Sequence, residues 1–440
     1  MSSRRQQDVS ENPDVSRIPS ALADALAATN LEPIIDALAT TSLEAIARIG
    51  FESLLENSPG EAMERNEAMR QMVSTSTATP TGSPVAKELQ AATFAPSADY
   101  VKLDAGSFGI IFQQAGTLDV LKISQRHKPD IWREYLMQIR IHKAFQSLSG
   151  PVSIDIRIPQ PKFFLSSVDE SGRYWWKQNI HAFPPEEKIS PEYTIVMERI
   201  LPMTDIIRKG LTRMYCPENN RQAALDNPKA KHCLARVILG RRRKISNRPP
   251  QFFSLRNINL NLDQLYELQA EVDLYAKAMA QTLAVMHWKV QCNARDVEFV
   301  IGSTPPSMAE AQQTSGSVAT LDALYTFQKR SVHLWMLDFN QVRIVSMDRD
   351  GVKEIVAAFT DNEPYFPKPH TDKDQALWDL FKDSYLDMSR ILEAAEAMST
   401  MSTPAWAAAG LPQMFIDGVV EERRATLVAR AEKDNWAAEI

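Results

Sequence analysis

Two glycines and a lysine lie near one another in an arrangement suited to holding an anionic group. Gly106 and Gly109 stand among apolar residues in the run 101–112 (VKLDAGSFGIIF), and the short apolar segment that follows carries Lys122. Glycines let backbone N–H groups approach phosphate oxygens closely. A glycine pair before a strand is more often an ordinary turn, so the motif gains weight only from other elements in the same order.

Three further elements follow in the order in which protein kinases carry theirs. Glu134 lies in the helical stretch 131–146 and could pair with Lys122, and 198–200 (ERI) resembles a kinase hinge. The run 338–340 (DFN) after an apolar strand resembles the metal-binding element of kinases, with asparagine in place of glycine. The resemblance implies an α+β, protein-kinase-like two-lobed fold with an N-terminal helical extension and a helical C-terminal lobe. The residues it places against a substrate in the cleft are Gly106, Ser107, Lys122, Glu134 and Asn340.

The segment that should carry a catalytic loop departs from the kinase pattern. His287 ends a helical stretch, as in kinases, and Asp296 follows, but no asparagine comes four or five residues later to hold a second metal ion. Arg295-Asp296 could stand for the usual Arg-Asp pair, or Asp296 could be displaced. A phosphotransferase lacking this ligand must stabilise the developing charge in another way, so we do not expect protein phosphorylation.

Four motifs between residues 285 and 369 point to a closer relationship. They are 285–288 (VMHW), 296–302 (DVEFVIG), 337–341 (LDFNQ) and 361–369 (DNEPYFPKP). Together they resemble a fungal family that was long filed as a domain of unknown function with a zinc-finger label, and that includes arginine-containing cyclodipeptide synthases. The resemblance covers roughly residues 100–395.

The family resemblance implies a tRNA-dependent aminoacyl transfer. Arginine from Arg-tRNA would be joined to the aminoacyl group of a second tRNA to give a cyclic (diketopiperazine) dipeptide, a natural product. The aminoacyl ester is already activated, so neither a cofactor nor a metal is expected. The implied partners are two aminoacyl-tRNAs, with no DNA and no membrane, and the implied location is the cytoplasm.

Acidic residues are the candidates for the chemistry of this reaction. A guanidinium is bound by paired carboxylates with fork geometry, and a base must accept the proton of the attacking amine. Asp296, Glu298 and Asp338 would converge in a kinase-like cleft and could divide these two roles. Glu298 could instead form a fold-stabilising ion pair, with Arg295 or Arg343 as its partner.

Two other side chains are weaker candidates. His287 is the alternative base, although a structural histidine bonded to the backbone at a helix end is the interpretation we favour. Ser107 in the glycine-rich run could act as a nucleophile, but no base adjoins it in the sequence.

A basic segment without acidic residues is the candidate tRNA surface. Between Asn227 and Leu262 there is no Asp or Glu but nine Lys and Arg, and removing these nine charges from the net charge of −6 leaves −15 for the rest of the chain. Phe252 and Phe253 lie among them and could stack on unpaired bases. A solvated loop, or a nuclear-localisation-like run, explains the same charges. The predicted tRNA contacts are Lys229, Lys231, Arg236, Arg241, Arg242, Arg243, Lys244 and Arg248.

The cysteines give little sign of a metal or of disulfides. Cys216, Cys233 and Cys292 are too few and too scattered for a disulfide framework, and together with His232 they lack the spacing of a structural zinc site. No run reaches the ~18 apolar residues of a membrane span. The polar N-terminus has no apolar core of a secretory signal.

The elements that position these residues follow from composition and apolar spacing. We expect short helices over 19–56, a linker over 73–85, a long helix over 263–287 and C-terminal helices over 373–397 and 412–436. The runs KFFLSS, RYWWKQ and YTIVMERI are typical of strands, LWMLDF of a buried strand, and 303–320 of a flexible insertion. The expected divisions are 1–95 (tail, helical extension and linker), 96–203 (N-lobe and hinge), 204–263 (irregular basic insertion) and 264–440 (helical C-lobe).

Two other functions fit part of the sequence. Gly106, Gly109, Lys122 and Asp338 support an ATP-dependent kinase of small molecules. The missing metal-binding asparagine supports a non-catalytic, pseudokinase-like scaffold. A response to Mg-ATP would separate the kinase from the other two functions.

Overall fold

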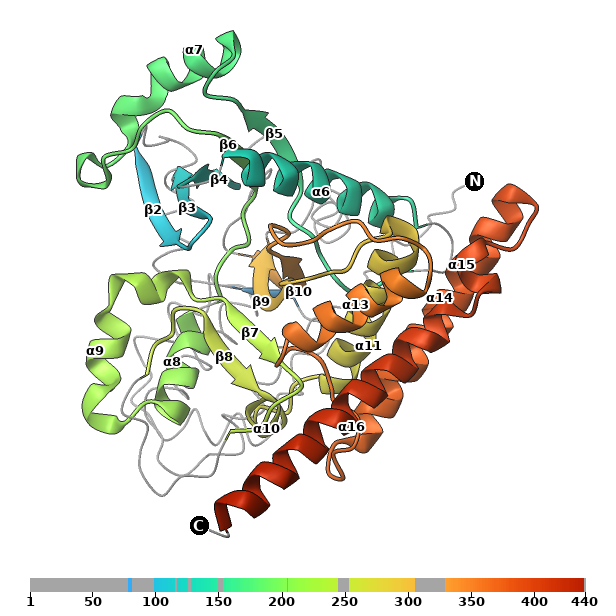
Figure 1. Ribbon diagram of the computed structural model, residues 1–440. Helices are drawn as coiled ribbons and strands as arrows, with labels where there is room; N and C mark the ends of the chain where they lie inside the picture. Colours follow the sequence, from blue (N-terminus) through green and yellow to red (C-terminus); the bar gives the residue numbers. More distant parts are fainter. Residues whose placement is uncertain are drawn as a thin grey trace, which may run out of the picture. The chain divides into compact units, whose positions relative to one another are not determined.

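The computed structural model describes residues 78–80, 99–114, 117–125, 128–148, 153–203, 205–243, 253–304 and 329–438 (Figure 1). All of them belong to one compact unit, Pro59–Ile440. The helices predicted over 19–56 lie outside the described residues, as do most of the linker at 73–85 and of the insertion at 303–320.

The fold is α+β, with two five-stranded sheets. The first sheet is antiparallel throughout, in the order β2-β3-β4-β6-β5. Its strands are β2 (Tyr100–Ala105), β3 (Gly109–Gln114), β4 (Asp119–Ser124), β5 (Pro161–Leu165) and β6 (Thr194–Glu198). Helix α6 (Lys128–Gln146) follows β4, where the sequence predicted a helix over 131–146, and it packs against β5 and β6 (Figure 1).

An aromatic cluster forms the core on the other side of this sheet. Phe112 and Trp176 pack around Phe183, with ring centroids 5.1 and 5.6 Å from it. Trp176 belongs to α7 (Glu170–Asn179), so the strand predicted for RYWWKQ is wrong. Asp169 begins this helix as its N-cap, accepting a hydrogen bond from the N–H of Gly172 at 2.7 Å. A capped, amphipathic start therefore outweighs the β-propensity of three adjacent aromatic residues.

The second sheet has the order β1-β10-β9-β7-β8, in which only the β7–β8 pair is parallel. The segment 204–263 contributes two of these strands and two helices, so the prediction that it is irregular is wrong. The strands are β1 (Ala78–Pro80), β7 (Ala235–Ile238), β8 (Ile258–Asn261), β9 (Glu298–Thr304) and β10 (Lys329–Leu337).

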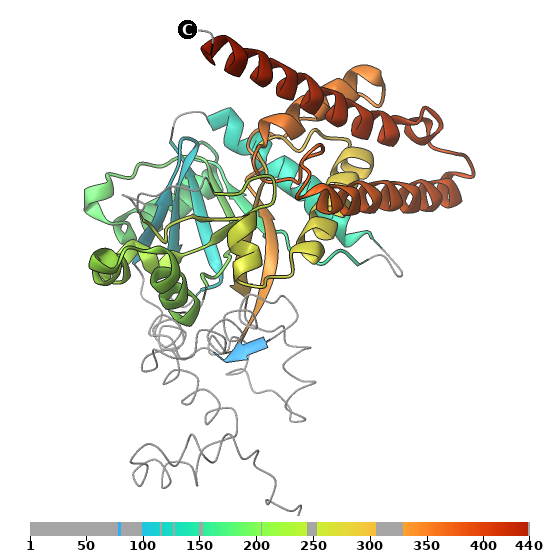
Figure 2. The same ribbon diagram turned by 90° about the horizontal axis from the view of Figure 1, so that it is seen from below.

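The α-helices that follow β6 in the described part of the chain are α8 (Asp205–Tyr215), α9 (Arg221–Asp226), α10 (Leu262–Glu267), α11 (Val272–Ala284), α13 (Arg349–Asp361), α14 (Gln375–Thr400), α15 (Ala405–Ala408) and α16 (Leu411–Ala438). Short 3-10 turns occur at Ile180–Ala182, Pro185–Glu187, Glu218–Asn220 and Pro228–His232. Figures 1 and 2 both show α14 and α16 on the side away from β2 and β3. None of the helices among the described residues is both long and apolar enough to span a membrane.

The long helix predicted over 263–287 is interrupted and changes type. It breaks between α10 and α11, where Gln269 adopts a left-handed backbone with φ 51°. After α11 the helix widens into a π-helical turn, Val285–Val290. That turn packs against α6, so it braces the helix that carries Glu134.

The two sheets are joined through the connection that follows β6. Leu201 and Ser303 exchange two backbone hydrogen bonds, of 3.0 and 2.8 Å, which tie this connection to β9. Gly302 makes the approach possible, because a Cβ placed there would stand 2.3 Å from Cγ2 of Ile200 and 3.2 Å from the carbonyl oxygen of Leu201. The connection on β9 is therefore one of the contacts that tie the two sheets together, beside the bridge between Arg157 and Trp335 of β10.

Replacing Gly302 with alanine should lower the free energy of unfolding by about 1–3 kcal/mol, because the added methyl group overpacks the joint. Gly106→Ala is the control, since a Cβ there meets nothing within 4 Å. Thermal and urea unfolding of both variants measures the difference. Equal free energies of unfolding for the two variants would mean that the contact between Gly302 and Ile200 relaxes enough to accept a methyl group.

Candidate functional site

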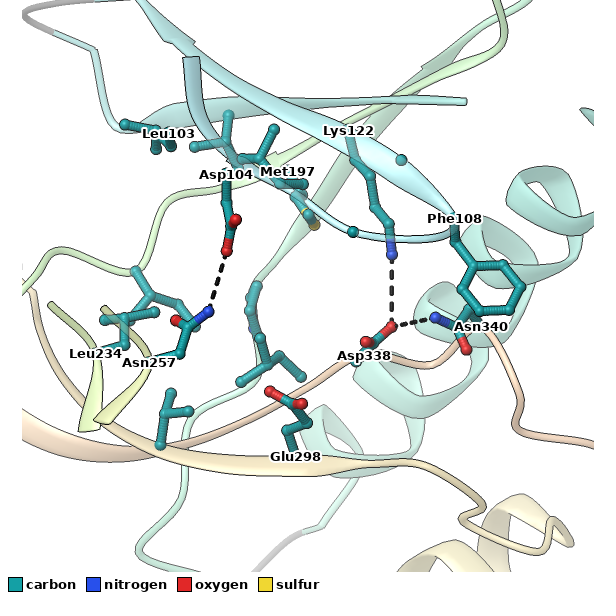
Figure 3. A pocket seen from close by; sticks show the side chains of 18 of the residues that line it. Leu103, Asp104, Phe108, Lys122, Met197, Leu234, Asn257, Glu298, Asp338 and Asn340 are labelled. Atoms are coloured by element: carbon teal, nitrogen blue, oxygen red, sulfur yellow. Dashed lines mark hydrogen bonds and ion pairs between the residues drawn. The ribbon is translucent and has the colours of Figure 1, made fainter. Parts of the chain in front are cut away.

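A cavity of about 480 Å³ opens between the two sheets. Its upper wall comes from the turn between β2 and β3, from β4 and from α6. Its lower wall comes from β9, which begins at Glu298, and from the end of β10 (Figure 3). Asp296, two residues before β9, also lines the cavity. The turn holds Gly106, Ser107 and Phe108, and Gly106 N–H donates to the carbonyl oxygen of Gly109 at 2.9 Å. The size is that of an ordinary ligand pocket.

A buried lysine joins the upper and lower walls. Lys122 Nζ lies 2.5 Å from Glu134 Oε1 on α6 and 3.5 Å from Asp338 Oδ1, just after β10. Burial lowers the pKa of Lys122, but the carboxylates of Glu134 and Asp338 outweigh it, so its pKa is raised and it stays charged. Asn340 Nδ2 donates to Asp338 at 2.6 Å (Figure 3). The sequence prediction that Lys122 pairs with Glu134 is confirmed.

Asp296 lines the cavity and is held through hydrogen bonds, while Arg236 and Lys122 lie nearby without forming an ion pair with it. Its N–H donates to Asn362 Oδ1 at 2.6 Å, and its Oδ2 accepts from Gln341 Nε2 at 2.6 Å. Asn362 also donates to the carbonyl oxygen of Ala294 at 2.9 Å. Asp296 makes no ion pair with any residue that the structure describes. Burial raises its pKa and the nearby Asp338 raises it further, against the opposing effect of Arg236 and Lys122, which lower it.

Both Asp296 and Asp338 have left-handed backbones, with φ 62° and 65°. Such a conformation is uncommon outside glycine and is retained where the surroundings enforce it. The contacts of Asn362 and Lys122 supply that constraint. Aspartate tolerates this conformation better than most residues do, and here it directs both carboxylates toward one cavity.

Glu298 is neutralised from within the protein. Arg236 on β7 binds it with two hydrogen bonds, Nε to Oε2 at 3.0 Å and Nη2 to Oε1 at 2.6 Å. Tyr365 also hydrogen-bonds Glu298; burial raises the pKa of this phenol and Glu298 adds to the shift. The ion pair considered for Glu298 therefore exists, with Arg236 as partner instead of Arg295 or Arg343, and Arg236 faces the cavity.

The cavity carries more negative than positive charge. Six carboxylates and four permanent cations line it, a net charge of −2, since burial and then the nearby Arg199 lower the pKa of His232 to about 4 and keep it neutral. Glu298 and Asp104 each have a cation of their own within ion-pair distance, whereas Glu134 and Asp338 share Lys122. Asp296 and Glu198 form no ion pair with a described residue, and Glu198 accepts a hydrogen bond from the N–H of Gln160. The excess charge therefore lies at Glu198 and at the neighbouring Asp296 and Asp338.

The glycine-rich turn is fastened to the segment before β8. Asp104, at the end of β2, forms an ion pair with Arg256 and accepts from Asn257 Nδ2 at 3.2 Å (Figure 3). Asn257 has φ 50°, a left-handed conformation that asparagine tolerates. Neither partner of Asp104 was identified from the sequence.

His287 lies in the core, away from the cavity. It is 1% exposed within the π-helical turn, its Nδ1 is 2.9 Å from the hydroxyl of Tyr385, and it packs against Phe415. Burial lowers its pKa to about 3. His287 is therefore a structural residue of the core and does not line the cavity.

The basic segment is largely paired inside the protein. Arg241 donates to Asn261, Arg242 binds Asp374, and Arg243 binds Asp263 and Glu267. Arg242 and Arg243 also lie over the rings of Tyr266 and Tyr215. Lys231 is exposed. Lys244, Arg248 and the side chain of Lys229 lie outside the described residues, as does Phe252. Contact of this segment with tRNA stays a prediction.

Comparison with known proteins gives one match. A family model described as "DUF3669: Zinc finger protein" matches residues 334–397, which run from the end of β10 into α14. No curated protein and no solved structure matches the chain. The matching model carries no mention of cyclodipeptide synthesis, and nothing found supports a synthase, so the interpretation of the chain as a member of the arginine-containing cyclodipeptide synthase family is wrong.

The zinc label of that family does not fit the residues present. The matched segment contains no cysteine and one histidine, His370. Among the described residues no three His, Cys, Asp or Glu side chains are grouped as metal ligands. All three cysteines are buried and unlinked, and burial raises the pKa of the Cys233 and Cys292 thiols to about 12, which opposes thiolate ligation.

Purified protein should contain much less than one zinc per chain, and a chelator should leave its melting temperature unchanged. Metal analysis by emission spectrometry and thermal unfolding with and without EDTA measure both. One tightly held zinc whose removal unfolds the protein would overturn this assignment.

Asp296→Asn should stabilise the protein at pH 7. A folded-state pKa above the unfolded one means that stability is lost as the pH rises through it, and asparagine removes that loss. The gain should be about 0.5 kcal/mol, since Asp296 is exposed to solvent screening. It should vanish on acidification below about pH 4, where the unfolded carboxyl is also protonated.

Asp338→Asn is the matched control, because it takes a partner from the buried Lys122 and should lower stability. Urea unfolding between pH 3 and 8 compares the two variants. A loss of stability in Asp296→Asn at pH 7 would show that Asp296 is favourably paired.

Proposed function

We propose that the two sheets form a kinase-like two-lobed arrangement. The antiparallel order β2-β3-β4-β6-β5, with α6 inserted after β4, supports this, as does the pairing of Lys122 with Glu134. The β9–β10 hairpin followed at once by Asp338-Phe339-Asn340 supports it from the other half. A fold of this type does not fix the reaction.

In this cleft, we propose, arginine is joined as its tRNA ester to a second aminoacyl group, and the product is a cyclic dipeptide. The observation that carries the proposal is the excess negative charge at Asp296 and Asp338, on the wall of a cavity of ligand size. A guanidinium would relieve the cost of keeping Asp296 ionised there and would gain fork-like hydrogen bonds. Arg236 on Glu298 is an example of that geometry within the same cavity.

The reaction needs two aminolysis steps. In the first, the free α-amine of one aminoacyl ester attacks the ester carbonyl of the other. An amide C–N bond forms, and the C–O bond between the attacked carbonyl and the ribose of its own tRNA breaks, which releases that tRNA. The amine proton passes to a carboxylate and from there to the departing ribose oxygen. In the second step the remaining α-amine attacks the remaining ester, closing the ring and releasing the second tRNA.

Asp296 and Asp338 divide these tasks in the proposal. Asp338, already beside Lys122 and Asn340, is oriented on two sides and binds the substrate cation. Asp296 accepts the amine proton, because a carboxyl group with a raised pKa is better matched to that role. Glu298 is left to position Arg236 and Tyr365.

A second candidate is an ATP-dependent kinase of small molecules. The contact of Lys122 with both Glu134 and Asp338, under a glycine-rich turn, specifically favours it. The ion pair of Glu298 with Arg236 counts against it, since a second metal ion would need free oxygen ligands on this side of the cavity.

The reaction is tested with pure protein, tRNAs charged with arginine and with other amino acids, and no ATP. Cyclic dipeptides containing arginine should appear by mass spectrometry and disappear after RNase treatment. Citrullyl-tRNA, which replaces the guanidinium by a neutral urea of nearly the same shape, should react at least about tenfold more slowly.

Asp338→Asn should mainly reduce this preference for arginine, and Asp296→Asn should slow both substrates strongly and reduce the preference to a smaller extent. Asp350→Asn, on the exposed start of α13, is the control and should match the unchanged protein. Transfer of phosphate from Mg-ATP to a small molecule, with no cyclic dipeptide from charged tRNAs, would replace the proposal with the kinase.

A further inference from the structure

The cavity has an apolar end as well as an acidic one. Figure 3 shows Leu103, Leu234 and Asn257 on the side opposite Asp338 and Asn340, with Met197 between them. Asp104 lies on the same side, where its charge is matched by Arg256 and its carboxylate accepts from Asn257. The apolar side chains come from both sheets: Leu103, Ile111, Val120, Met197, Leu234 and Val300. This composition suits a flat, largely apolar ring placed between the two sheets.

The connection after β6 borders this apolar end. The N–H groups of Glu198, Arg199 and Leu201 donate to the carbonyl oxygens of Gln160, Leu118 and Ser303. Ile200 lines the cavity between them, and its N–H donates to no backbone carbonyl of the described residues. Its side chain sits against Gly302, so the backbone of this connection is fixed in place. A ring with hydrogen-bonding groups on its edge matches such a strip of backbone.

We infer that the apolar end is a nucleoside subsite, which takes the 3′-terminal adenosine of an aminoacyl-tRNA and presents its ester to Asp296 and Asp338. Every tRNA ends in adenosine, and the ester sits on that ribose, so the base and the reacting carbonyl are one ribose apart. One cavity with an apolar end for the base and an acidic end for the arginyl group holds both. The inference rests on the proposed function, because an adenosine could also arrive as ATP.

The experiment uses the full chain and two non-hydrolysable probes, 3′-arginylamino-3′-deoxyadenosine and its cytidine counterpart. Calorimetry should show the adenosine probe binding at least about tenfold more tightly than the cytidine probe. Leu103→Ala should weaken adenosine binding about tenfold by uncovering one face of the ring. Val101→Ala, on the same strand but outside the cavity and 45% exposed, should change nothing.

Val120→Phe is a second variant, which fills the apolar end from β4. Its melting temperature establishes that it folds, and it should abolish binding of the adenosine probe. Equal binding of the two probes, or full binding to folded Val120→Phe, would overturn the subsite.

Two measurements distinguish the end of a tRNA from ATP as the origin of the bound adenosine. Binding of the arginyl probe without magnesium, and competition by adenosine 5′-monophosphate at least as strong as by Mg-ATP, support the tRNA end. Mg-ATP binding far more tightly than the arginyl probe assigns the subsite to ATP and overturns the tRNA source. Cyclic dipeptide formed from charged tRNA, together with equal binding of the two probes, leaves the proposed function standing and refutes the subsite alone.

Discussion

The contact of Lys122 with Glu134 and Asp338 is the interaction on which the rest of the site depends. It connects β4, α6 and the end of β10 through one ammonium group, so it fixes the upper wall of the cavity relative to the lower. Desolvating three charges is costly, and such a group persists only when its partners are well placed. The π-helical turn against α6 and the hydrogen bond from Asn340 to Asp338 supply that placement. Lys122 cannot, however, neutralise two carboxylates fully, and Asp296 adds a third negative charge nearby.

That imbalance separates this cavity from a simple ion-pair network. Glu298 and Asp104 are matched by Arg236 and Arg256, and these pairs serve the shape of the cavity. Asp296 and Asp338 keep left-handed backbones and a shortage of positive charge, which costs stability and is typical of a site kept for a ligand. The proposed arginyl group supplies the missing cation at the acidic end, and the proposed adenosine fills the apolar end. Both inferences therefore depend on the cavity having one acidic and one apolar end.

Local patterns in the sequence predicted what local physics determines. Apolar β-branched runs gave β4 and β6, helical spacing gave α6, α14 and α16, and Lys122 and Glu134 met as expected. The errors lie where distant contacts decide. Nothing near Gln269 signals a helix break, because the sequence there has no glycine or proline. His287 could not be placed in the core without knowing that Tyr385 and Phe415, about a hundred residues away, would surround it. Likewise the acids that neutralise Arg242 and Arg243 come from other segments, and Asn362 gives no local sign that it holds residue 296.

The direct test of the central claim, that uncompensated carboxylates at Asp296 and Asp338 select a cationic aminoacyl group, is the proton balance of binding. Calorimetry of arginine amide in buffers of different ionisation enthalpy measures the protons released. Because a bound cation lowers the raised pKa of Asp296, we expect protons to be released near that pKa and affinity to increase as the pH rises through it. Binding without proton release at any pH, or equal affinity for the neutral citrulline amide, would contradict the claim.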